Sequence, residues 1–409
     1  MISEPASAYV WIWLPGTLNP VVCGRLDQVD DRIGFVYARS YLDRTDAVAI
    51  FEPELPLRRG YQYPASAATR GVPLCIDDAM PDSWGRRLVN YRLGELGAEF
   101  GDLTYLLESG SNRIGALDFQ NSATTYEPRT VSSVTLNDLV SASQLIESGQ
   151  PLNAELAAAL LRGTSIGGAR PKALVDDGER VLIAKFSSTT DTYPVVQGEY
   201  VAMELARRVG LDVAPVELTA VVGQRVLLIE RFDRSATGGR RRIVSALTVL
   251  GMTPFPEGRF ATYTDLSHKI RAGFANPEAT LRELFGRIAF NMACGNTDDH
   301  GRNHAAFVGT TNLELTPAYD ICPQARSGES ASQAMAFDAQ GNRNARFSLL
   351  LDAAPLYLLE KRDASDIVAG IVATIHDQWN DVCDAAELTA HERSRFWGRQ
   401  FLNPHLFEA

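Results

Sequence analysis

The chain has 409 residues, of which 45% are hydrophobic and 22% charged, so it is long enough for two or three globular domains with sizeable cores. Its formal net charge of −11 at pH 7 argues against direct binding of nucleic acid over a broad surface, which needs clustered Lys and Arg. The five cysteines are scattered without a C-x-x-C pair, and they indicate neither a disulfide scaffold nor a zinc site. No apolar stretch reaches the ~18 residues that span a membrane, and the amino terminus lacks the basic region of a secretory signal. We therefore expect a cytoplasmic protein without membrane contact.

The first part of the chain, residues 1–125, is expected to be a small α+β domain of strands and short helices. Residues 9–14 have the apolar pattern of its first strand. The domain is expected to end in the low-information stretch 120–130.

The second part, residues 126–235, is expected to be an α/β lobe with an antiparallel sheet. The apolar residues Val201, Leu205 and Val209 recur on one face of a helix. The predicted elements of this part are a helix over 154–161, a strand over 180–186, a helix over 197–211, and a hairpin over 213–222 and 225–229.

The third part, from residue 236 onward, is expected to be mainly helical because its apolar residues recur at helical intervals. The predicted helices cover 265–272, 277–291, 348–359, 364–376 and 389–401. The polar stretch 326–344 is rich in Gly, Ser, Ala and Asn and is expected to be a mobile insertion.

Small residues and a Lys follow the first helix of the second part, at 163–175. Glycines let backbone N–H groups approach phosphate oxygens, and Lys172 adds a positive charge, although an ordinary turn remains the alternative. The segment is not a Walker A sequence. Lys185 has the position of the strand Lys that contacts nucleotide phosphates in kinases, or it simply reaches solvent from the strand end. Glu199 either favours a helix N-terminal dipole or pairs with Lys185.

The polar run 296–303 places Asp298 five positions before Asn303, between two apolar segments. Phosphoryl transfer needs a carboxylate that takes the proton of the attacking hydroxyl and a neutral oxygen that helps to hold Mg²⁺, and one loop with this spacing supplies both. The same residues also make ordinary turns. Asp320 stands 17 residues after Asn303, behind a predicted hairpin over 305–308 and 313–315 that carries it back beside the loop. It is either a second metal ligand or a helix N-cap.

Two other polar clusters have simpler interpretations. His300 and His304 lie four residues apart, but their loop context and the lack of a third ligand argue against zinc. We expect His300 to brace the loop by hydrogen bonding. The basic run 240–242 is expected to be a solvated loop.

Several motifs occur together in the order of a known family. They are 165–172 with its Gly-Gly-Ala, Lys185 in its strand, Glu230-Arg231-Phe232-Asp233-Arg234, Asp298-x-His300-x-Arg302-Asn303, Tyr319-Asp320-Ile321, and the earlier motifs 80–84 and 112–117. In these residues the chain resembles the HipA-like serine/threonine kinases, the toxin components of bacterial toxin–antitoxin pairs. Arg302 departs from the pattern, since Lys is frequent there, and so does Arg170-Pro171, where Gln-Glu is familiar.

The resemblance implies a role for each matching residue. Asp298 would be the catalytic base, and Asn303 and Asp320 would hold Mg²⁺. The residues implied to bind ATP are Gly167, Gly168, Ala169, Arg170, Lys172 and Lys185 at the phosphates, Glu230 and Phe232 at the adenine, and Ser165, His300 and Arg302 beside them. Ser165 would be autophosphorylated, which switches the kinase off, with Thr164 as the adjacent alternative.

The resemblance also implies an α+β, two-lobed protein-kinase-like fold: an α/β N-lobe over 126–235 and a helical C-lobe over 236–409, behind the N-terminal domain. The implied activity is phosphorylation of a cellular protein, such as an aminoacyl-tRNA synthetase. A HipB-like helix-turn-helix antitoxin would restrain it and contact DNA on its behalf. The alternatives are a scaffold or co-repressor in an antitoxin–DNA complex and a small-molecule kinase.

Overall fold

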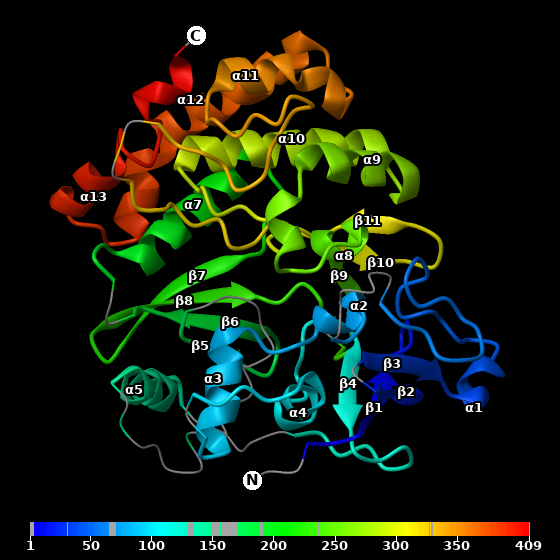
Figure 1. The fold of residues 1–409 in the computed structure, drawn as a ribbon. Helices are drawn as coiled ribbons and strands as arrows, with labels where there is room; N and C mark the ends of the chain where they lie inside the picture. Colours follow the sequence, from blue (N-terminus) through cyan, green and yellow to red (C-terminus); the bar gives the residue numbers. More distant parts are fainter. Residues whose placement is uncertain are drawn as a thin grey trace. The chain divides into compact units, whose positions relative to one another are not determined.

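The computed structural model describes residues 4–30, 32–64, 71–95, 97–129, 135–148, 150, 156, 160, 170–188, 191–235, 237–326, 328 and 330–408. The chain forms two compact units, one made of residues 1–190 with 220–244 and the other of 191–219 with 245–409. Helices and antiparallel strands occur in both units, which confirms the predicted α+β class (Figure 1).

The first unit begins with a four-stranded antiparallel sheet in the order β3-β2-β1-β4. Its strands are β1 (Ser7–Ile12), β2 (Val21–Val29), β3 (Arg32–Tyr37) and β4 (Leu117–Gln120). Ala8, Val10 and Ile12 alternate along β1 and are completely buried, as expected for a strand with one face on the core. The strand predicted at 9–14 is therefore present, displaced by two residues toward the amino terminus.

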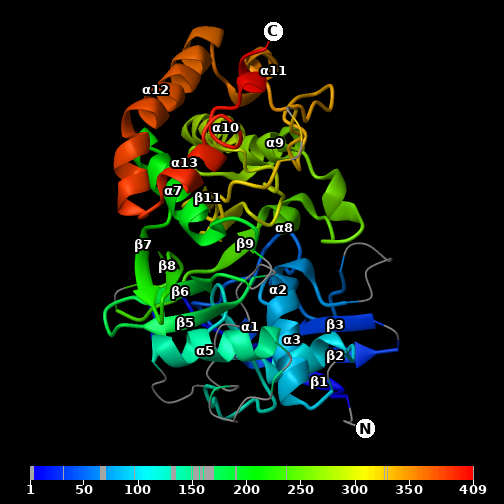
Figure 2. The ribbon, with the colours of Figure 1, turned by 90° about the vertical axis from the view of Figure 1, so that its left-hand side faces the viewer.

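The described residues of the first unit also form the helices α1 (Arg39–Leu42), α2 (Leu74–Asp77), α3 (Ser83–Arg92), α4 (Asp102–Glu108) and α5 (Leu136–Glu147). α5 was not predicted from the sequence, although Thr135 and Asp138 form a capping box at its start. The helix packs along the edge strand of the second sheet (Figure 2). The helix predicted at 154–161 falls mostly outside the described residues.

The second sheet has the order β5-β6-β8-β7, from β5 (Lys172–Asp176), β6 (Val181–Phe186), β8 (Gln224–Glu230) and β7 (Val216–Val221). β5, β6 and β8 pair antiparallel, with Lys172 opposite Lys185 and Leu182 opposite Glu230. The strand predicted at 180–186 is thus confirmed. The hairpin predicted over 213–222 and 225–229 is also confirmed, because β7 and β8 are neighbours in this sheet. Gly223 has φ +74° in the turn between β7 and β8, a conformation that glycine adopts without strain.

The second unit is mainly helical, as predicted for the third part of the chain. Its elements are α7 (Val195–Val209), α8 (Ala246–Leu250), the 3-10 turn η1 (Glu257–Phe260), α9 (Tyr263–Gly273), α10 (Pro277–Cys294), β10 (Ala305–Val308), β11 (Leu313–Leu315), α11 (Phe347–Asp352), η2 (Ala354–Tyr357), α12 (Lys361–Ala385), α13 (Ala390–Phe396) and η3 (Pro404–Phe407). The short strand β9 (Ile243–Ser245) lies at the boundary between the units. α10 is central, packing against α9 and α12, and α12 also packs along α7 (Figures 1 and 2).

Three predicted helices differ in length from the observed ones by more than three residues. The helix predicted at 348–359 stops at Asp352 and continues as a 3-10 turn, because Pro355 cannot donate a helical hydrogen bond. The helix predicted at 364–376 extends over Lys361–Ala385, and the one predicted at 389–401 ends at Phe396.

The polar stretch 326–344 is not a mobile insertion where the structure describes it. Met335, Ala336 and Phe337 are buried, and bridges pair Thr262 with Ala336 and Ser332 with Asn344. The expectation failed because three adjacent apolar residues inside a polar stretch anchor it to the core of the second unit.

Candidate active site

The polar run 296–303 begins where α10 ends. Gly295 terminates the helix with φ +71°, and a Cβ at this position would lie 2.8 Å from the carbonyl oxygen of Gln400. Both facts require glycine. The Asn296 N–H then donates to the Asn291 carbonyl at 2.9 Å, which turns the chain away from the helix axis into the loop.

Short-range hydrogen bonds fix the loop itself. The His300 N–H donates to the Asp298 carbonyl at 2.9 Å, and the Asn303 N–H donates to the His300 carbonyl at 2.8 Å. The Asn303 side chain donates its Nδ2–H to the same Asp298 carbonyl at 3.1 Å. With its N–H group on that carbonyl, Asn303 has its amide oxygen as the side-chain atom suited to a cation.

Asp298 is the exposed carboxylate of the loop. Partial burial raises its pKa, and the nearby charges of Asp320 and Asp299 raise it further, while His300 lowers it. The structure therefore brings Asp298 and Asp320 within electrostatic reach of each other, as the sequence predicted. A raised pKa is a property of a carboxylate suited to accept a proton.

Asp320 lies just beyond the β10–β11 hairpin, which confirms the predicted hairpin. Its backbone has φ +58°, a conformation that costs free energy for a residue with a side chain and therefore marks a position held by its surroundings. Tyr319 beside it donates its hydroxyl to the Arg302 carbonyl at 2.7 Å, which ties the segment to the loop. No helix follows Asp320 in the described residues 321–326, so the N-cap interpretation is wrong.

Asp299 is the loop residue that the sequence analysis missed. Its carboxylate is buried and accepts hydrogen bonds from the Tyr263 hydroxyl, from Asn291 Nδ2 at 2.6 Å and from His304 Nε2 at 3.0 Å. Burial would raise its pKa, but His304 and these hydrogen bonds outweigh burial, so the pKa lies below the usual value and Asp299 stays charged.

The bracing role expected of His300 therefore belongs to His304. His300 is exposed, whereas His304 is buried beside Tyr263 and Asp299. A signal was present, because His304 immediately precedes the apolar strand Ala305–Val308 whereas His300 lies within the polar run.

Of the residues implied to bind ATP, the structure describes Arg170, Lys172, Lys185, Glu230 and Phe232 in the first unit and His300 and Arg302 in the second. Lys185 is buried within β6, so it is not a strand-end Lys that reaches solvent. Glu230 ends β8, with its carboxylate 3.8 Å from Arg180 Nη1, and Phe232 is half-buried just after it. Arg170 is also half-buried.

Lys172 has a different environment from the one expected of a phosphate ligand. It is 1% exposed, and its ammonium nitrogen lies 2.5 Å from Asp82 Oδ2. Asp82 also caps α3 through the Gly85 N–H, and the Trp84 indole donates to the Lys172 carbonyl at 3.3 Å. The motif at 80–84 thus holds the start of β5.

The remaining predictions concern residues 164–169, Glu199 and the basic run 240–242. Ser165, Thr164, Gly167, Gly168 and Ala169 are outside the described residues. Glu199 is buried in α7 beyond its first turn, so the dipole interpretation is wrong, and its pairing with Lys185 stays a prediction. The run 240–242 is not simply solvated: Arg240 lies over the Trp13 ring at 3.4 Å and donates to the Ser111 carbonyl at 3.0 Å.

The donor chemistry of the loop fits Mg²⁺. The Asn303 amide oxygen and the Asp320 carboxylate are hard oxygen ligands, and Mg²⁺ is usually held by one or two such groups together with substrate phosphates and water. Among the described residues, no group of three or more His, Cys, Asp or Glu gathers into a larger metal site. No helix within the described part of the chain is long and apolar enough to cross a membrane.

Comparison with known proteins gives two family matches. The model of the HipA-like C-terminal domain matches residues 164–379, and the model of the HipA N-terminal domain matches residues 14–120.

Individual relatives agree with these matches. The serine/threonine-protein kinase toxin HipA of Shewanella oneidensis is 25% identical over 327 residues, which cover 73% of this chain and 74% of that protein. The putative kinase Y4mE of Sinorhizobium fredii is 32% identical over 146 residues, or 34% of this chain and 33% of the relative. The solved complex of Shewanella oneidensis HipA, HipB and operator DNA contains a chain with a TM-score of 0.70, covering 98% of this chain and 100% of that one at 20% identity, which shows a shared fold.

Proposed function

The chain belongs to the HipA-like family, and we propose that it is an ATP- and Mg²⁺-dependent serine/threonine protein kinase that acts as the toxin of a toxin–antitoxin pair. One observation carries the proposal. The loop 296–303 holds an exposed carboxylate of raised pKa, Asp298, and an oriented amide, Asn303, with the strained Asp320 close by. We further propose a two-lobed protein-kinase-like fold behind an N-terminal domain, with an N-lobe over 126–235 and a C-lobe over 236–409.

The proposed roles follow from the chemistry of these groups. The Asp298 carboxylate accepts the proton of the substrate Ser or Thr hydroxyl while that oxygen bonds to the γ-phosphorus and the bond to the β-phosphate breaks. Asn303 and Asp320 would hold Mg²⁺, which supplies charge neutralisation at the phosphates. Asp299 does not touch the substrate and instead fixes the loop through its three donors.

The proposed nucleotide site uses residues of the first unit. Lys185 would contact the phosphates, backbone atoms near Glu230 and Phe232 would receive the adenine, and the segment 167–172 would cover the phosphates. The burial of Lys172 against Asp82 supports a role for that residue in shaping the segment more than in touching phosphate.

Replacement of the proposed base tests the reaction. Asp298→Asn should keep the fold and ATP binding but lower the transfer rate about a hundredfold or more, because a positioned base is removed. Phosphate transfer from radiolabelled ATP to a generic protein substrate and to the kinase itself measures this. Asp366→Asn, which alters an exposed carboxylate on α12, is the matched control and should leave the rate unchanged. Unchanged turnover in Asp298→Asn would refute the assignment.

Replacement of the proposed metal ligand tests the nucleotide complex. Asp320→Ala should abolish Mg²⁺-dependent ATP binding, because the carboxylate ligand is gone. Calorimetric titration with ATP, with and without Mg²⁺, measures this. Equal Mg²⁺-dependent ATP affinity in the wild type and the variant would show that the metal lies elsewhere.

Regulation and partners extend the same proposal. We propose that Ser165, or Thr164 beside it, is autophosphorylated and that a phosphate of about −1.5 to −2 charge beside phosphate-binding N–H groups lowers ATP affinity. Mass spectrometry after incubation with ATP and Mg²⁺ should find one phosphate there, absent in Asp298→Asn. Phosphate at another residue, with the same loss of ATP affinity, would show that a different residue is the regulatory phosphorylation site.

The proposed partner is a HipB-like helix-turn-helix antitoxin through which the protein contacts DNA indirectly, and the proposed target is a cellular protein. The solved complex of a structurally similar HipA with HipB and operator DNA supports the partner. Co-expression with the product of an adjacent helix-turn-helix gene, followed by co-purification, tests it.

A further inference from the structure

The segment that follows β8 is attached to the N-terminal domain, the part of the first unit matched over 14–120. Arg231 donates from Nη1 to the Asn112 carbonyl and to Asn112 Oδ1, both at 3.0 Å, and from Nη2 to the Arg113 carbonyl at 2.7 Å. Arg234 donates to Asn112 Oδ1 at 2.9 Å and to the Gly115 carbonyl at 3.1 Å. Two side chains from 231–234 therefore bind three residues of the motif at 112–117, namely Asn112, Arg113 and Gly115.

Asp233 completes this attachment. Its carboxylate accepts the Gly115 N–H at 2.7 Å, Arg231 Nε at 2.9 Å and Nη2 at 2.7 Å, and Arg234 Nη1 at 2.8 Å. All three charged residues have side chains no more than 8% exposed. Buried charges are stable only when they are paired and their hydrogen bonds are satisfied, so the cluster has one favourable geometry.

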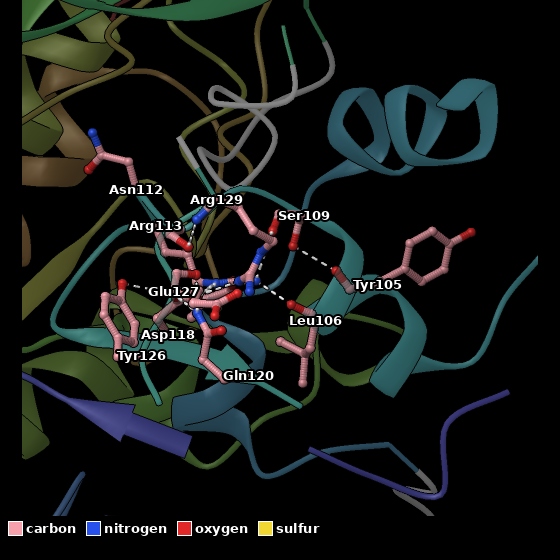
Figure 3. Close-up of polar contacts among 12 residues, drawn as sticks. Tyr105, Leu106, Ser109, Asn112, Arg113, Asp118, Gln120, Tyr126, Glu127 and Arg129 are labelled. Carbon is pink, nitrogen blue, oxygen red and sulfur yellow. Dashed lines mark hydrogen bonds and ion pairs between the residues drawn. The ribbon is translucent and has the colours of Figure 1, made fainter. Parts of the chain in front are cut away.

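The receiving motif is itself rigid. Arg113 is completely buried, and it donates to Asp118 Oδ1 and to the Ala79 carbonyl, each at 3.0 Å. Asp118 also accepts from Arg129 Nη2 at 2.7 Å and from the Tyr126 hydroxyl at 3.0 Å (Figure 3). This second buried ionic cluster thus holds the carbonyls of Asn112 and Arg113 in place, where they accept hydrogen bonds from Arg231 and Arg234.

The residues between these anchors are those assigned to adenine. Glu230 is held in the sheet by its register with Leu182, and the Arg231 N–H donates to the Val181 carbonyl at 3.0 Å. On the other side, Asp233 is held by Gly115. The backbone of 230–232 therefore lies between a strand of its own sheet and a loop of the N-terminal domain that is more than a hundred residues away in the sequence.

We propose that Arg231, Asp233 and Arg234 are positioning residues that set the adenine-recognition segment 230–232 against the N-terminal domain, so that this domain determines nucleotide selectivity. This inference rests on the proposed function, in which the chain binds ATP. Adenine recognition through backbone atoms depends on where those atoms lie, whereas binding of the phosphates depends on other residues.

The test separates adenine recognition from phosphate binding. Asp233→Asn should weaken ATP binding about tenfold, the effect of roughly one lost hydrogen bond, and should bring ATP affinity closer to GTP affinity. Affinity for inorganic tripolyphosphate should not change. Titration calorimetry of the full chain with ATP, GTP and tripolyphosphate in the presence of Mg²⁺ measures all three.

Asp338→Asn is the matched control. Asp338 is also a buried carboxylate, but it lies in the second unit, where it accepts the Gln340 N–H at 3.0 Å and the Asn342 N–H at 2.8 Å. This variant should lower stability without changing the ratio of ATP to GTP affinity. A purely structural role for Asp233 would instead make the two variants alike.

A second pair of variants is less disruptive. Asn112→Ala removes the oxygen that Arg231 and Arg234 share and should reduce the ratio of ATP to GTP affinity in the same direction as Asp233→Asn. Asn112→Asp keeps an acceptor there and should retain the wild-type ratio. A ratio unchanged in both Asp233→Asn and Asn112→Ala, in a wild type that binds ATP, overturns the inference alone. A wild type that binds no ATP overturns the proposed function and the inference together.

Discussion

Asp298 and Asp299 are adjacent carboxylates with opposite environments, and replacing each by Asn should separate catalysis from stability. Asp298 is exposed and its pKa is raised, so its charge is disfavoured in the folded protein. Asp298→Asn should therefore change the free energy of unfolding by no more than about 0.5 kcal/mol, the usual effect of a surface substitution. Asp299 is buried and its pKa is lowered, so its charge is favoured there.

The cost of Asp299→Asn follows from its three donors. The Tyr263 hydroxyl and Asn291 Nδ2 both donate to Oδ2, and an amide oxygen at that place can still accept both, more weakly. The new NH₂ group faces His304 Nε2, whose bond to the carboxylate is lost. A hydrogen bond to a charged group contributes about 1.5–3 kcal/mol, so we expect a loss of about 2–4 kcal/mol.

Guanidinium unfolding followed by far-UV circular dichroism measures this difference, and hydrogen exchange of a peptide covering 286–306 locates it. Wild-type stability should also fall with acid, because a carboxyl of lowered pKa stabilises the fold above its unfolded pKa of about 3.9 and loses this contribution as the pH decreases below it. Asp299→Asn should lack that part of the acid dependence. Equal stability of Asp298→Asn and Asp299→Asn would refute the conclusion that Asp299 fixes the loop through its three donors.

Three further outcomes are expected. Gly295→Ala should lower the free energy of unfolding by about 2–4 kcal/mol, because the backbone is left-handed and the added Cβ would meet Gln400. Gly398 has the same φ of +71° but no atom within 4 Å of an added Cβ, so Gly398→Ala should cost only about 1–2 kcal/mol. Thermal unfolding measures both. Asp118 has a lowered pKa because Arg113 and Arg129 outweigh burial, so Asp118→Asn should remove part of the stability that the wild type loses below about pH 4 in acid titrations; identical acid limbs would contradict this. All five cysteines are buried, and burial raises the pKa of Cys294 to about 12, so an aromatic disulfide reagent should label them only after denaturant is added, and labelling of the native protein would contradict their burial.

The parts of the site that were predictable from the sequence depend on short-range spacing. Asp298 and Asn303 belong to one loop, and Asp320 follows it through a single hairpin, so their proximity could be inferred from a few residues of pattern. The partners of Asp299 could not be inferred in this way. Tyr263 comes from α9 and Asn291 from α10, and only the packing of those helices brings them to one carboxylate.

Contacts of charged side chains with residues far away in the sequence could not be predicted from local sequence patterns either. Asp82 and Lys172 are 90 residues apart, and Lys172 was predicted to be a phosphate ligand because it follows the glycine-rich segment. Arg240 was predicted to be solvated because it belongs to a basic run, but it lies over the Trp13 ring. The capping box of α5 was a local signal that the sequence analysis overlooked.

The contacts that hold the start of the loop 296–303 involve residues that are synthesised about a hundred positions later. Gly295 lies against the backbone of Gln400, and the Leu402 N–H donates to the Ala293 carbonyl at 2.8 Å, so residues near 400 complete the place where the loop leaves α10. The apolar face of α7 is likewise covered by α12, which comes about 150 residues later in the chain. A growing chain therefore carries every residue of the proposed catalytic loop, together with Tyr263, Asn291 and His304 that hold Asp299, before it carries Gln400 and Leu402, which complete the place where the loop leaves α10.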